Sequence, residues 1–159
     1  MKHVTLASIE KAIKKVDNLD DAGLEELTKT YSLSQETLLS YVVSAAYEYQ
    51  NEELEGYILY YFCLLNECFF QEGLNPEAVT EDDIDAFEEP YFEMLDAYFE
   101  SEDDEELEHF CDQPELAQFM AMEISTEDED GTMMNDETAT QLFIVTIAMI
   151  SLLGRKITA

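Results

Sequence analysis

Apolar residues recur at three- and four-residue spacing along most of the chain, as they do on one face of an α-helix. The first such set is Leu6, Ile9, Ile13 and Val16, which predicts a helix over residues 5–17. The same periodicity predicts further helices over about residues 24–31, 35–49, 52–71, 81–88, 90–100, 102–110, 114–124 and 136–153. No segment shows the clean period-two alternation of a strand. The sequence therefore predicts an all-α fold.

Two of the predicted helices are apolar on nearly every face. They cover residues 54–70 and 142–153, and both are longer than a typical buried strand. We expect them at the centre of a compact bundle of about six to eight helices. A chain of 159 residues has the size of a single domain. Loops are expected near residues 73–80 and 125–136.

Individual residues mark several helix ends. Ser34 is expected to N-cap the third helix, and Gly73 to follow the C-terminus of the fourth. Thr80, with Asp83 three residues later, predicts a capping box that uses Asp in place of Glu. Pro90 suits a first helical turn, so residues 81–100 are expected to form two helices or one kinked helix.

The charge of the chain is strongly negative. It has 38 Asp and Glu against seven Lys and Arg, a net charge of −31, and residues 30–154 contain no Lys or Arg. This balance argues against direct binding of nucleic acid or of an anionic membrane surface. The acids are densest between residues 77 and 115, where 18 of 39 residues are acidic. We expect that segment to dominate the electric field.

Within that segment one helical face is acidic. Its carboxylates recur at three- and four-residue spacing: Glu89, Glu93, Asp96 and Glu100. The aromatic and apolar residues are expected on the other side: Tyr91, Phe92, Leu95, Tyr98 and Phe99. Like charges at this spacing destabilise a helix by about 0.2–0.5 kcal/mol per pair, and a cationic partner would relieve that repulsion. The alternative is a face that serves only solubility.

These features favour a non-catalytic interaction protein of the inhibitor or immunity type, which covers a basic surface of a nucleic-acid-acting protein. In charge and helix content the chain resembles DNA-mimic and toxin-neutralising proteins of phages and bacteria. This resemblance is one of composition, and no sequence motif carries it. Helix positions about 5–6 Å apart do not reproduce the phosphate density of a duplex, which favours a patch matched to one basic protein. The expected partner contacts are Glu89, Glu93, Asp96, Glu100, Asp103 and Asp104.

A second hypothesis is a divalent-cation-binding module. Residues 126–137 resemble a degenerate EF-hand loop, with Asp128, Asp130 and Glu137 at its third, fifth and twelfth places. Thr126 stands at the first place, where an Asp is expected. The alternative for these residues is a solvated acidic loop.

An enzyme is the third hypothesis, and the chemistry for it is sparse. The five glycines are isolated, so no phosphate-binding loop is formed, and no GxSxG motif occurs. Glu106 and His109 make one Glu-x-x-His pair, whereas di-iron bundles use two. We expect no catalytic residues and no cofactor. The pattern does not indicate an oligomeric state.

The expected location is the cytoplasm. No apolar secretory segment follows Lys2. The three cysteines include no CxxC pair, and Cys63 and Cys68 lie among Leu and Phe residues, so we expect these two as reduced thiols in the core. A zinc site from these cysteines lacks ligand spacing. The apolar run over residues 142–153 is shorter than the ~20 residues that a bilayer requires, which favours a buried helix over a membrane span.

Overall fold

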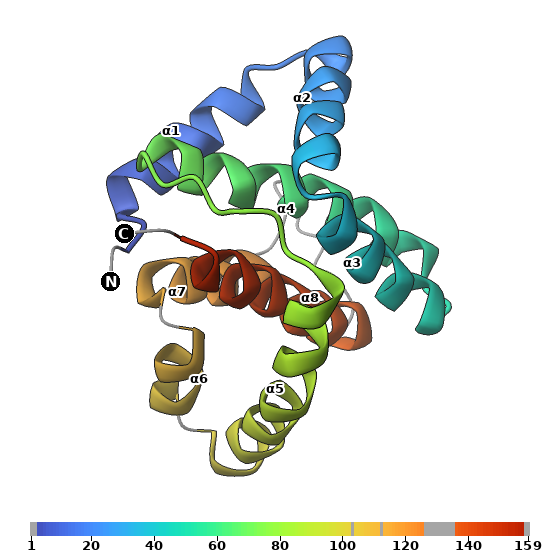
Figure 1. The fold of residues 1–159 in the computed structure, drawn as a ribbon, viewed down its shortest axis with the longest axis vertical. Helices are drawn as coiled ribbons and strands as arrows, with labels where there is room; N and C mark the ends of the chain where they lie inside the picture. The colour runs from blue at the N-terminus through green and yellow to red at the C-terminus, as the bar shows by residue number, and fades with distance from the viewer. Residues whose placement is uncertain (1–2, 103, 112, 126–135, 158–159) are drawn as a thin grey trace.

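The computed structural model describes residues 3–102, 104–111, 113–125 and 136–157, and these form eight helices and no strand (Figure 1). The predicted all-α fold is confirmed, and the number of helices agrees with the prediction. In chain order the helices are α1 (Leu6–Asp17), α2 (Asp21–Ser34), α3 (Glu36–Glu48), α4 (Glu52–Gln71), α5 (Glu81–Ser101), α6 (Asp104–Cys111), α7 (Pro114–Ser125) and α8 (Asp136–Arg155).

Helices α4 and α8 form the centre of the molecule, as predicted. α4 packs against α1, α2, α3 and α8, and α8 also packs against α3, α5, α6 and α7. Residues 61–69 of α4 and 145–154 of α8 are buried without interruption. By length and hydropathy alone residues 137–155 could cross a membrane, but 72% of the apolar window is buried inside the molecule. This burial is that of a core helix.

The helix ends follow the sequence signals at two of the three expected places. The capping box forms at α5: the Asp83 N–H donates to Thr80 Oγ1 and the Thr80 N–H donates to the Asp83 carboxylate. Gly73 adopts a left-handed φ of 78° after α4. Its N–H and that of Leu74 donate to the carbonyls of Phe70 and Phe69, at 2.9 and 3.0 Å, which closes a Schellman motif.

The prediction that Ser34 caps α3 is wrong. Ser34 is the last residue of α2, and its hydroxyl donates back to the Tyr31 carbonyl at 3.2 Å. Gln35 takes the N-cap position of α3 without a side-chain cap. The buried Gln35 amide bonds to a distant loop, so a tertiary contact prevails over the local capping preference.

Pro90 lies inside one helix, α5, so the alternative of two separate helices is excluded. Proline has no N–H to donate to the carbonyl four residues earlier. Here both Pro90 and Ala86 are exposed, so water can bond to the freed carbonyl. The helix therefore continues across the proline on its solvent side.

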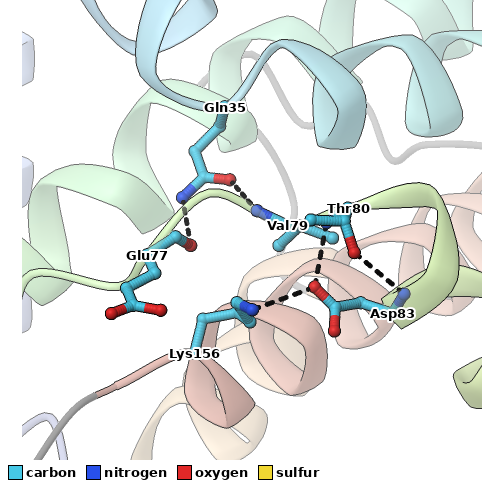
Figure 2. Close-up of polar contacts among 6 residues, drawn as sticks. All are labelled: Gln35, Glu77, Val79, Thr80, Asp83 and Lys156. Carbon is cyan, nitrogen blue, oxygen red and sulfur yellow. Dashed lines mark hydrogen bonds and ion pairs between the residues drawn. The ribbon is translucent and has the colours of Figure 1, made fainter.

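The loop before α5 is held by two distant parts of the chain (Figure 2). The Gln35 amide donates to the Glu77 carbonyl at 3.1 Å and accepts from the Val79 N–H at 3.0 Å. The Glu77 N–H donates to the Lys156 carbonyl at 2.9 Å, and Lys156 Nζ lies 3.1 Å from Asp83 Oδ2. These bonds fix the start of α5 relative to α3 and α8.

Candidate partner-binding surface

The structure places the predicted acidic face of α5 in solvent. Its four carboxylates are all exposed and follow the helical repeat along one side: Glu89, Glu93, Asp96 and Glu100. The opposite side packs into the core through Ile84, Phe87, Tyr91, Met94 and Leu95. Asp103 lies outside the described residues, and Asp104 is described only as the first residue of α6.

Two phenylalanines that were expected on the side opposite the carboxylates are half-exposed. Phe92 is 47% exposed and Phe99 is 48% exposed. They are seven residues apart, two helical turns, so they stand at the edge of the apolar stripe and not at its centre. Tyr98, by contrast, packs against the core and stacks on Phe143, with ring centroids 6.0 Å apart. The acidic face of α5 is therefore also aromatic.

A groove runs between α3 and α5, and both helices pack against α8. Its deeper part is a cavity of about 270 Å³, floored by α8 residues that include Val145 and Ala148. A shallower hollow of about 470 Å³ shares Tyr41 and Ser44 with this cavity and extends it toward the N-terminus of α5. We call the two together the α3/α5 groove.

Carboxylates from both walls of the α3/α5 groove face it. Glu48 of α3 and Glu88 of α5 line the deeper cavity, together with four aromatic residues: Tyr41, Tyr49, Tyr91 and Phe92. The shallower hollow is lined by three further acids: Glu36, Glu81 and Asp85. No sequence pattern indicated this groove, because its walls lie about 40 residues apart in the chain and both pack against α8.

Two tyrosines of the groove have a raised pKa, in part because of the acids beside them. Burial raises the pKa of Tyr41 to about 12, and the negative charges of Glu88 and Glu48 add to that effect. Burial also raises the pKa of Tyr49, with Glu48 as a further cause. Both phenols therefore stay protonated and neutral at physiological pH. Within the described chain the Tyr41 hydroxyl has no hydrogen-bond partner, so it can donate to a ligand.

Three basic side chains make their ionic or aromatic contacts outside the α3/α5 groove. Lys15 Nζ lies 2.8 Å from Glu67 Oε1, and Lys156 pairs with Asp83. The guanidinium carbon of Arg155 lies 5.1 and 4.8 Å from the ring centroids of Phe87 and Phe110. Among the residues that the structure describes, no Lys or Arg lines the α3/α5 groove.

Glu67 is a buried carboxylate that the sequence analysis did not single out. It accepts hydrogen bonds from Tyr31, Lys15 and Gln71. Burial acts to raise its pKa, but these hydrogen bonds together hold the pKa below its ordinary value of 4.5. All its partners belong to the protein, so Glu67 stabilises the contact between α1, α2 and α4 and offers no reactive group to a ligand.

The remaining candidates lie away from the groove. Asp128 and Asp130 of the expected cation-binding loop fall outside the described residues, and Glu137 is exposed near the start of α8. In the described ranges, no group of three or more His, Cys, Asp or Glu side chains is arranged to hold a metal. The expected burial of the Cys63 and Cys68 thiols is confirmed, and Cys111 is buried as well.

Burial also raises the pKa of the Cys63 and Cys68 thiols and makes them poor nucleophiles. It raises the pKa of Cys68 to about 12, with the Glu67 charge as a smaller cause, so the reactive thiolate is scarce at neutral pH. His109, of the single Glu-x-x-His pair, is exposed near the end of α6. It lines none of the hollows along α3 and α5.

No protein family, curated protein or solved structure matches the chain. The function is therefore inferred from the geometry and the charge of this surface.

Proposed function

We propose that this protein is a non-catalytic acidic interaction protein that binds a basic surface of another protein, as an inhibitor or an immunity-type partner does. One observation carries the proposal: exposed carboxylates and half-exposed phenylalanines share one side of α5. The ion pairs that the described residues show involve Glu67 and Asp83 and none of these carboxylates. Phe92 and Phe99 are the aromatic members of this set.

The two kinds of side chain have different roles in such binding. Carboxylates steer a cationic partner during its approach and raise the association rate. Aromatic residues are the usual source of buried contact area at the centre of a protein interface. A face that served solubility alone would gain nothing from exposing Phe92 and Phe99.

The proposed partner is a basic protein, of the kind that acts on nucleic acid. A surface that mimicked a duplex would need rows of carboxylates at phosphate density, about one charge per 1.7 Å of axis. The face of α5 has one carboxylate every three or four residues and interrupts them with phenylalanine. This pattern favours a match to one particular protein over general DNA mimicry. We also propose a cytoplasmic location, because free thiols suit a reducing compartment.

The test begins with affinity capture from an extract, after which the captured protein is purified and its Kd is measured against the wild-type chain in a sodium chloride series. The variant Glu93→Gln/Asp96→Asn/Glu100→Gln should keep its fold and bind at least about tenfold more weakly at low salt, with a shallower dependence on salt. The matched control neutralises three exposed carboxylates of α1 and α2: Glu10→Gln/Glu25→Gln/Glu26→Gln.

The control variant should lose little affinity, since it changes the net charge equally but leaves α5 intact. If the α5 variant binds the purified partner as tightly as the wild type at low salt, the acidic face serves only solubility and the proposal is wrong. Circular dichroism of each variant verifies that helix content is unchanged.

A further inference from the structure

We infer that the α3/α5 groove binds an arginine-bearing segment of a basic partner, with one guanidinium group seated in the deeper cavity between Glu48 and Glu88. This inference rests on the proposed function and specifies the chemistry by which the partner is recognised. It adds a specific site for one cationic side chain beside the outer face of α5 that the proposed function uses.

The deeper cavity has the size and lining that a single cationic side chain requires. Its volume of about 270 Å³ lies below the range of ~300–1,000 Å³ that is typical of small-molecule sites. Glu48 and Glu88 approach it from opposite walls, so a cation between them meets a carboxylate on either side. Neither glutamate forms an ion pair within the described part of the chain.

The aromatic walls favour arginine over lysine. A guanidinium group is planar, stacks on aromatic rings and donates several hydrogen bonds in its plane, whereas an ammonium group is a compact, strongly hydrated charge. Tyr41, Tyr49 and Phe92 supply neutral rings beside the two carboxylates. The chain already uses this contact internally, because the Arg155 guanidinium lies over the rings of Phe87 and Phe110.

The shallower hollow extends the same recognition along the chain of the partner. Glu36, Glu81 and Asp85 line it, and it joins the deeper cavity at Tyr41 and Ser44. A segment that seats one arginine in the cavity would therefore place its neighbouring residues beside three further carboxylates. The charge of the whole groove is complementary to a basic segment and not to an isolated cation.

The test uses two short capped peptides of equal length and charge, one alternating glycine with arginine and the other alternating glycine with lysine. Binding to the full chain is measured by titration calorimetry at about 20 mM sodium chloride. We expect the arginine peptide to bind about three- to tenfold more tightly than the lysine peptide. This is the range of affinity that a guanidinium group gains by stacking on an aromatic ring, from a ring that is exposed to one that is desolvated.

Three variants locate the site. Glu48→Gln/Glu88→Gln should weaken the arginine peptide at least about fivefold more than the matched Glu89→Gln/Glu93→Gln, which removes the same charge from the outer face of α5. Phe92→Leu, at a half-exposed position, should reduce the preference for arginine and leave the lysine peptide nearly unaffected. Thermal melting of each variant verifies the fold.

The outcomes separate this inference from the proposed function. If the wild-type chain binds both peptides equally, or if the two double variants lose equal affinity, the groove is not the site and the general attraction to basic proteins stands. If the wild-type chain binds neither peptide at low salt, the proposed function fails together with the inference. Arginine preference that depends on Glu48, Glu88 and Phe92 supports both.

Discussion

At the scale of single residues, the contact between Lys15 and Glu67 shows how a chain with few cations uses one of them. The Glu67 side chain is fully buried, whereas that of Lys15 is 44% exposed. A buried carboxylate is costly unless charge-assisted hydrogen bonds offset its desolvation. Lys15 of α1, Tyr31 of α2 and Gln71 of α4 donate these hydrogen bonds. One lysine thereby joins α1 to the central helix.

We expect Lys15→Met to destabilise the fold by about 1–3 kcal/mol near pH 7, because the buried carboxylate loses a charged hydrogen-bond donor. The pKa of Glu67 in the folded state lies below its ordinary value of 4.5, so the ionised form stabilises the fold above that pH. The stabilisation disappears as the pH falls through the lowered pKa.

Urea denaturation at about pH 7 and at about pH 3 measures this effect. The difference in unfolding free energy between wild type and Glu67→Gln should be large at the higher pH and smaller at the lower one. Lys11→Met, at an exposed position on the same helix, is the control and should change stability little at either pH. An equal difference at both values would contradict the role assigned to the ionised carboxylate.

At the scale of secondary-structure elements, helix α4 contains one glycine and is followed by another, and the two have opposite roles. Gly56 lies inside the helix, and a Cβ added there meets no atom within 4 Å. Gly73 also has open space, but its φ is 78°, a conformation that L-residues rarely adopt. The space around the two residues is alike, so only the backbone conformation distinguishes them.

Substitution of each glycine by alanine should therefore change stability in opposite directions. We expect Gly56→Ala to stabilise the protein by about 1 kcal/mol, the difference in helix propensity between the two residues. Gly73→Ala should destabilise it by about 1–2 kcal/mol, because a side chain disfavours the left-handed conformation. Midpoints of urea denaturation compare the two variants directly, and a change of the same sign in both would show that φ is not the deciding factor.

At the scale of the whole molecule, the excess of negative charge opposes folding. The chain has 38 acids and a net charge of −31, and the ion pairs that the described residues show, Lys15 with Glu67 and Lys156 with Asp83, offset little of it. Repulsion among exposed charges is long-ranged in dilute buffer and is screened beyond about 10 Å in 0.1 M salt. Folding gathers these charges into a smaller volume, so it should be more favourable in salt.

The melting temperature should accordingly rise by several degrees between about 20 and 200 mM sodium chloride. A rise of 2–4 °C corresponds to about 1 kcal/mol for a protein of this size. The variant Glu93→Gln/Asp96→Asn/Glu100→Gln should melt slightly higher than wild type at low salt and respond less to salt, since like charges on one helical face are removed. Equal melting temperatures across the series would mean that the acids are too far apart to interact.

The sequence predicted the parts of this fold that depend on neighbouring residues. The bounds of α4, the capping box at Thr80 and the left-handed Gly73 all follow from contacts within one or two turns. The errors arose where distant segments decide. Ser34 does not cap α3 because Gln35 is bonded to the 77–79 loop, and Phe92 is exposed because α3 and α5 leave a groove beside it.

The exposure of the acidic face of α5 could be predicted from the sequence, whereas the α3/α5 groove could not. Charge density along the chain pointed to α5, and its four carboxylates do lie in solvent. Glu48 and Glu88 did not attract notice, because each is an ordinary surface acid in its own helix. They become a pair only when α8 brings α3 and α5 to the same cavity.

The order in which the groove is assembled has a consequence for the nascent chain. Both walls of the groove come from α3 and α5, whereas its floor comes from α8, the last helix. During synthesis the acidic walls therefore leave the ribosome well before the residues that hold them together. A chain that has not yet reached α8 already contains all but two of the 38 acids but lacks the floor of the cavity, so the arginine recognition proposed above requires α8 to have been synthesised and docked.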